Sequence, residues 1–136
     1  MCIVQLLYQN IQNFNKRNNK NNLTNLSYMI FLLNIELKKV YQLITIKKIK
    51  NTTNEQKEND LIYHIKTSCL IIDLFFLAIN EELLTDSSDK DIEDTMFIFY
   101  ELYDILNLCL SKLQNQTYKE FCDFAKTNND FKKKIL

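Results

Sequence analysis

The sequence contains no glycine, no proline and no tryptophan, and it has one histidine and one arginine. A phosphate-cradling loop, a dinucleotide fingerprint and an EF-hand turn all need glycine where the backbone turns left-handed or approaches a ligand closely. The sequence therefore excludes these three sites in their standard form. Leucine, isoleucine, lysine and asparagine are abundant instead, which is the composition expected of an AT-rich genome, so the absences themselves indicate little about the fold.

Metal sites and catalytic sites are also poorly represented. The acidic stretch near residues 86–94 resembles a calcium loop, but a twelve-residue loop begun at Asp86 or Asp89 would end at Phe97 or Tyr100 instead of glutamate. His64 is the only histidine, and we expect it to be a helix-surface imidazole. The sequence predicts no catalytic residue, no metal ligand and no cofactor, and hence a protein that is not an enzyme.

The four cysteines show no C-x-x-C pair, and two of them fall in or beside apolar helix faces. Buried free thiols are the expected state of such residues. Free thiols favour a reducing compartment, so the sequence predicts an intracellular, cytoplasmic protein. The cysteines are Cys2, Cys69, Cys109 and Cys122.

Charge is balanced overall but unevenly distributed, because residues 1–60 carry nine Lys or Arg and four acids. A nucleic-acid-associated factor using this basic half is the alternative function. At about 100° per residue, however, the lysines of the second predicted helix scatter around it, and arginine is nearly missing. We therefore expect a solvated surface and no nucleic-acid partner; the lysines are Lys38, Lys39, Lys47, Lys48 and Lys50, with Tyr41 between them.

Apolar residues recur at intervals of three and four along most of the chain, which is the period of amphipathic helices. The spacing predicts an all-α fold, a single-domain antiparallel bundle of four to five helices covering residues 1–136. The last helix has two possible ends, because residues 127–130 can either break it or continue it. The predicted helices span about 3–15, 24–50, 54–84, 89–114 and 117–126 or longer.

The segment 61–84 is the most apolar part of the chain, and its polar residues Asn59, Lys66, Asp73 and Asn80 repeat every seven positions. A helix that is apolar on all sides except one narrow polar face is expected to be surrounded by other helices. We therefore predict that it is the central helix, and that its apolar run from Cys69 to Ile79 is too short to cross a membrane. Asp73 is expected at the wet edge; enclosure would instead shift its pKa and make it a functional candidate.

Four aromatic residues, Tyr28, Phe31, Phe97 and Tyr100, lie off the main apolar seams. Either the first and last helices cover them, or they stay uncovered and contact a partner. The second possibility predicts a non-enzymatic protein interaction module whose partner is another protein or a second copy. An assembly subunit, an adaptor and a helix-sequestering, chaperone-like bundle would all act in this way.

A peripheral membrane protein that binds through its first helix is a further alternative. The polar face of that helix carries Gln and Asn, however, and it lacks the lysines of a membrane-surface helix.

Overall fold

The computed structural model describes residues 3–18, 24–45, 53–82 and 90–135, and within these ranges the chain is helical almost throughout. Four long helices are followed by two short ones, and the described residues contain no strand. The predicted all-α antiparallel bundle is confirmed. The helices are α1 (Ile3–Asn18), α2 (Thr24–Thr45), α3 (Asn54–Glu82), α4 (Lys90–Asn115), α5 (Tyr118–Thr127) and α6 (Asn129–Lys134).

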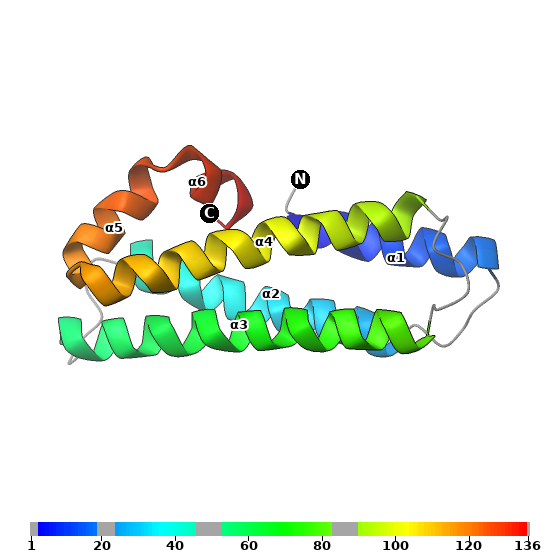
Figure 1. The fold of residues 1–136 in the computed structure, drawn as a ribbon, viewed down its shortest axis with the longest axis horizontal. Coiled ribbons are helices and arrows are strands. Elements are labelled where there is room, and N and C mark those ends of the chain that lie inside the picture. Colours follow the sequence, from blue (N-terminus) through cyan, green and yellow to red (C-terminus); the bar gives the residue numbers. More distant parts are fainter. Residues whose placement is uncertain (1–2, 19–23, 46–52, 83–89, 136) are drawn as a thin grey trace.

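The four long helices run alternately up and down and form a closed ring, in which α1 packs against α2, α2 against α3, α3 against α4, and α4 against α1 (Figure 1). Helix α1 occupies one end of the bundle, and α5 lies over the opposite end, where it contacts α2, α3 and α4. Helix α6 turns back along α4 and brings the C-terminus near the start of α1.

The predicted seams of α1, α2 and α4 form the core. Each repeats apolar residues every three or four positions, so its side chains share one helix face and are removed from water together. Every predicted seam residue of α1 and α2 is buried: Val4, Leu7, Ile11 and Phe14 of α1, and Leu26, Ile30, Leu33, Leu37, Val40 and Ile44 of α2. On α4, Ile92, Phe99, Leu106 and Leu113 are buried, and Met96, Tyr103 and Leu110 are half-buried against them.

The residue patterns Thr53-Asn54-Glu55-Gln56 and Thr117-Tyr118-Lys119-Glu120 predict capping boxes, and both are present. The Thr53 hydroxyl accepts a hydrogen bond from the backbone N–H of Gln56 at 3.1 Å, and Oε1 of Gln56 accepts one from the backbone N–H of Thr53. These two bonds cap the start of α3 at Asn54. Thr117 and Glu120 make the same exchange at the start of α5. Such reciprocal bonds satisfy amide groups that the first helical turn leaves without partners.

The last helical segment is interrupted at Asn128, so residues 127–130 break the helix instead of continuing it. Asn128 is extended, with φ −79° and ψ 114°, so it ends α5. Its side-chain oxygen accepts from the Phe131 amide at 2.9 Å and thereby caps α6. A polar residue that bonds the next turn competes with helix continuation, which explains the break.

Some predicted helix ends differ from the structure. The first helix is predicted to end at about residue 15, yet α1 continues through Asn18, because Lys16 is a good helix former and its charge favours the negative end of the helix dipole. Helix α4 runs from Lys90 through Asn115. The predicted positions 46–50, 83, 84 and 89 lie outside the described residues.

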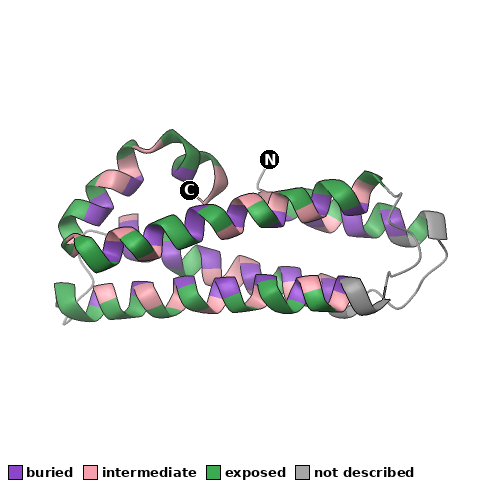
Figure 2. Ribbon diagram, viewed as in Figure 1, coloured by how far each residue is buried: buried purple, intermediate pink, exposed green. Residues whose placement is uncertain are grey.

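The prediction that α3 is the central helix is wrong. Helix α3 is one of the four long helices of the ring, and exposed residues recur along its described part (Figure 2). Leu70, Leu74 and Leu77 are 57%, 45% and 59% exposed. The bundle has no central position, because the ring leaves each of its four helices with one face toward solvent.

Candidate protein-binding surface

The four aromatic residues predicted at an interface are all exposed, between 48% and 63%. Tyr28 and Phe31 lie one turn apart on α2 with their rings stacked, 6.4 Å between centroids. Phe97 and Tyr100 are one turn apart on α4. Because α2 and α4 lie diagonally across the ring, the structure places the four residues as two separate pairs, and neither α1 nor α5 covers them.

The pair on α4 is continuous with α3 through an aromatic stack. The rings of Tyr100 and Phe76 are 4.6 Å apart and 25° from parallel, and Phe76 also meets Phe99 edge-on at 6.2 Å. Phe76 is half-buried, whereas Tyr100 keeps 54% of its surface in solvent. Tyr100 is therefore held in position by α3 while it remains available to a partner.

A third apolar surface was missed by the sequence reasoning. Six exposed residues of α3 share one side of the helix, and we call this set the outer face of α3: Tyr63, Lys66, Leu70, Asp73, Leu74 and Leu77. The signal was present, since Lys66 and Asp73 already marked a wet stripe and Leu70 and Leu77 lie on the same side at a spacing of seven. The high apolar content of α3 obscured it, because a mostly apolar helix is normally enclosed.

Asp73 is exposed, as predicted for the wet edge of α3. It lies one turn from the Cys69 thiol, and its carboxylate adds to the effect of burial in raising the pKa of that thiol to about 11. The carboxylate therefore acts on a neighbouring group while standing in solvent. Among the described residues, Asp73 is therefore a solvent-exposed carboxylate at the edge of α3.

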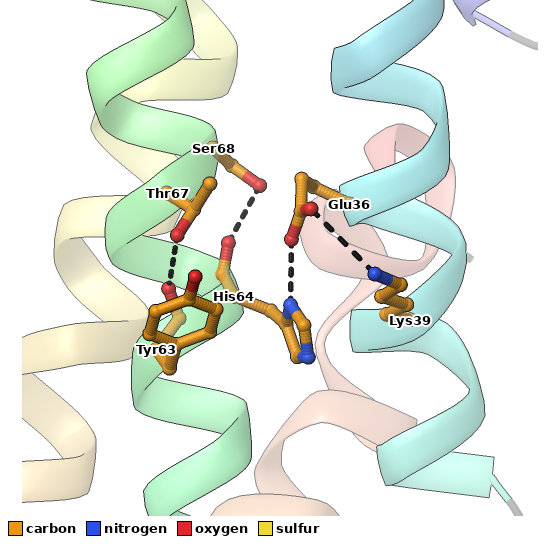
Figure 3. A network of polar contacts seen from close by, with 6 residues as sticks. All are labelled: Glu36, Lys39, Tyr63, His64, Thr67 and Ser68. Atoms are coloured by element: carbon orange, nitrogen blue, oxygen red, sulfur yellow. Dashed lines mark hydrogen bonds and ion pairs between the residues drawn. The ribbon is translucent and has the colours of Figure 1, made fainter.

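His64 occupies the seam between α2 and α3, where it is more buried than predicted. Its Nδ1 lies 2.6 Å from Oε2 of Glu36, and the two side chains are only 17% and 14% exposed (Figure 3). Lys39 Nζ lies 3.8 Å from the other oxygen of Glu36. No sequence pattern predicts this pair, because Glu36 is 28 positions away from His64 on a different helix.

The hydroxyls described next to His64 on α3 are engaged with backbone carbonyls. Thr67 and Ser68 are one turn away, but their hydroxyls donate to the carbonyls of Tyr63 and His64 at 2.8 Å (Figure 3). The Tyr63 ring meets the imidazole edge-on at 5.1 Å. The arrangement is a polar link that fixes the pairing of α2 with α3.

The described thiols are free and buried, as predicted. Burial raises the pKa of Cys109 to about 12, and it also raises the pKa of Cys122 above its usual value. A thiol with a raised pKa stays protonated at neutral pH and is a poor nucleophile. These cysteines contribute to packing. The position of Cys2 lies outside the described residues.

The other polar features of the described chain are small. A cavity of about 240 Å³ lies where α5 covers the end of the bundle, lined by Lys57, Tyr118, Cys122 and their neighbours. The Tyr118 hydroxyl donates to the Leu43 carbonyl, which fastens α5 to α2. Within the described ranges, no three His, Cys, Asp or Glu side chains come together as a metal site.

Lys38 of α2 and Lys134 of α6 line one pocket of about 200 Å³, together with apolar residues of α1 and α2. Lys38 and Lys39 are exposed, and Lys39 is paired with Glu36. Lys47, Lys48 and Lys50 lie outside the described residues.

By length and composition, the segment Asn54–Ile79 of α3 could cross a membrane, in contrast to the prediction made from its apolar run alone. The same criteria are met by core helices of soluble proteins. Since the buried side of α3 packs on α2 and α4, these criteria do not by themselves assign it to a bilayer.

Comparison with protein-family models, with curated protein sequences and with solved structures found no match to this chain. What it can do is therefore argued from the geometry of its own surfaces.

Proposed function

We propose that this chain is a non-enzymatic protein interaction module that binds another protein through its apolar helix faces. The observation that supports the proposal is the exposure of large apolar side chains on three helices of one bundle. They are the Tyr28–Phe31 pair, the Phe97–Tyr100 pair and the outer face of α3. Exposed apolar patches of this kind are characteristic of interaction surfaces.

The energy available at these surfaces is sufficient for specific binding. A half-exposed aromatic side chain offers about 100 Å², worth roughly 2.5 kcal/mol at about 25 cal/mol per Å² of apolar surface removed from water. Aromatic residues that are already ordered lose little side-chain entropy on binding, and the stacked rings of Tyr28 and Phe31 are of this kind. An amphipathic helix laid along α2 or α4 would cover one pair and become part of an assembly or be sequestered.

The polar chemistry of the described residues also supports binding over catalysis. The three described thiols are buried, His64 is paired with Glu36, and the nearby hydroxyls donate to backbone carbonyls. These three thiols, the imidazole of His64 and the hydroxyl of Ser68 are thus packed or paired within the bundle.

The test is a pull-down from the native cell with the tagged chain, followed by identification of the co-purifying proteins. Two double variants, Tyr28→Ser with Phe31→Ser and Phe97→Ser with Tyr100→Ser, are compared with Tyr41→Ser, which changes an exposed tyrosine of α2 outside both pairs. We expect the same partner to be retained by the wild type and by Tyr41→Ser. At least one double variant should lose it by about tenfold or more, since two aromatic anchors together exceed the 1.4 kcal/mol of a tenfold change.

Other outcomes would replace the proposal. A partner set unchanged in all variants, with unchanged circular dichroism, would exclude these aromatic pairs as the binding surface. Retention on a polyanion resin that falls with salt and is lost in Lys38→Gln with Lys39→Gln would support the nucleic-acid alternative. Flotation with liposomes would support a membrane-surface role.

A further inference from the structure

On the outer face of α3, large apolar residues are spaced symmetrically on either side of Leu70. Tyr63 lies seven residues before Leu70, and Leu77 lies seven residues after it. Seven residues are close to two helical turns, so the three side chains lie within about 20° of one line along the helix. All three are more than half exposed.

The two charges of this face are placed symmetrically as well. Lys66 precedes Leu70 by four residues, and Asp73 follows it by three. At about 100° per residue, they lie roughly 40° and 60° around the helix from Leu70, on the same edge of the face. Both side chains are exposed, and no ion pair is found for either of them among the described residues.

We infer that the partner of this face is a second copy of the same chain, packed with its α3 antiparallel to the first about a two-fold axis near Leu70. This inference rests on the proposed function, because it names the occupant of one of the proposed binding surfaces. A two-fold axis perpendicular to the plane of two antiparallel helices keeps each edge of the face on its own side. It brings Leu70 against Leu70, and Tyr63 of each copy against Leu77 of the other.

The charges meet under the same operation. Lys66 of one copy falls within about one residue, or 1.5 Å along the axis, of Asp73 of the other. Both ion pairs then form on one edge of the contact. A parallel pairing about an axis along the helices would place the charged edges of the two copies on opposite sides of the contact, where neither ion pair forms. The charge pattern therefore selects the antiparallel arrangement, as polar residues set the register of paired helices.

The surface is also of suitable size. The six residues of the outer face with Phe97 and Tyr100 at its edge each leave on the order of 100 Å² exposed, which together approaches the ~800 Å² per partner of a standard interface. Their apolar members lie toward the middle and the charges at one edge, which is the usual arrangement of an interface core and rim.

The first measurement is sedimentation equilibrium from about 1 to 100 µM. We expect the wild type to reach the mass of two chains and Leu70→Lys to remain at the mass of one, because the substitution places two like charges on the axis. Leu108→Lys is the matched control, since Leu108 is an exposed leucine of α4 outside the face, and it should dimerise as the wild type does. A wild type that stays monomeric throughout, or a dimer that Leu70→Lys leaves intact, overturns the inference.

Charge reversal tests the register. Lys66→Asp and Asp73→Lys should each raise the dimer dissociation constant by about tenfold, since two attractive rim pairs become repulsive. The combined Lys66→Asp and Asp73→Lys variant should return to within about threefold of the wild type. An equimolar mixture of the two single variants should form the heterodimer in preference to either homodimer. Failure of both the combined variant and the mixture to recover affinity overturns the antiparallel pairing.

Cysteine cross-linking tests the axis directly. A disulfide needs Cα atoms about 6 Å apart, so Leu70→Cys should cross-link to itself under mild oxidation. Leu77→Cys should not cross-link to itself, because the two positions would be about 21 Å apart. It should cross-link with Tyr63→Cys in a mixture, and self-linkage of Leu77→Cys would overturn the model. The wild-type chain, which contains only buried thiols among the described cysteines, is the control for the oxidation.

The two proposals can be wrong independently of each other. If the chain is monomeric but its aromatic variants lose a native partner, the self-pairing is wrong and the interaction module stands. If it dimerises as described and Tyr28→Ser with Phe31→Ser changes no partner, the α3 pairing, with Phe97 and Tyr100 at its edge, stands without the α2 surface.

Discussion

Among single residues, two buried thiols show how strongly the fold alters protonation. Burial raises the pKa of Cys109 from 9.0 to about 12 and that of Cys69 to about 11, and Asp73 adds to the shift of Cys69. Both thiols face the α3–α4 side of the core as neutral groups. Ionisation would place a charge among apolar side chains, which is why the folded state holds the protons more tightly than the unfolded state.

This shift makes stability depend on pH in a definite direction. Below pH 9 both the folded and unfolded chains carry protonated thiols, and the stabilisation is fully present. Between pH 9 and about 11 to 12 only the unfolded chain loses these protons, so the stabilisation is lost as pH rises. We expect the Tm to fall more steeply between pH 8 and 10.5 in the wild type than in Cys69→Ala with Cys109→Ala, as measured by circular dichroism. Parallel curves for the two proteins would contradict the assigned pKa values.

Among the helices, α3 shows how one element can be core and surface at once. Ile65, Ile72 and Phe75 are fully buried, while Leu70, Leu74 and Leu77 on the opposite side are exposed. Its link to α2 is polar as well as apolar, through the contact of His64 with Glu36. The helix therefore has two distinct sides, one packed in the bundle and one exposed to solvent.

Alanine substitutions two positions apart should separate these sides. Ile72→Ala is expected to lower the free energy of unfolding by about 2–5 kcal/mol, because it leaves a cavity in the core. Leu74→Ala is expected to change it by no more than about 0.5 kcal/mol, because Leu74 already contacts water. The measurement is urea unfolding at a concentration low enough to keep the chain monomeric. Equal losses would mean that α3 is enclosed after all.

For the molecule as a whole, the chain end completes the bundle. Helix α1 has 16 residues and α3 has 29, so α1 cannot line the full length of the ring. The open end is covered by α5, and α6 then returns along α4 (Figure 1). Phe131 of α6 is fully buried and meets Phe121 of α5 edge-on at 6.3 Å.

Removal of this anchor should destabilise the whole bundle. We expect Phe131→Ala to cost about 3–5 kcal/mol, the usual range for a buried phenylalanine. Lys132→Ala changes the next residue, which is exposed, and should stay within about 0.5 kcal/mol of the wild type in urea unfolding. A Phe131→Ala variant as stable as Lys132→Ala would show that α6 does not hold the end of the bundle.

The sequence by itself determined the helices and which side of most of them is apolar. The spacing of Leu26, Ile30 and Leu33 predicts a buried seam, and the Thr117–Glu120 pair predicts a helix start, because these interactions join residues within one or two turns. Both the seam and the helix start depend on the geometry of a single helix, which the order of residues along the chain already determines.

Only the tertiary structure decided where each helix stands and what lies across from it. It placed Glu36 against His64, left Tyr28, Phe31, Phe97 and Tyr100 uncovered, and gave α3 a solvent-facing side. These facts depend on how many neighbours surround each helix. The sequence pattern of α3 is compatible with a central position and with a place in a ring, and the packing of the other three long helices chose between them.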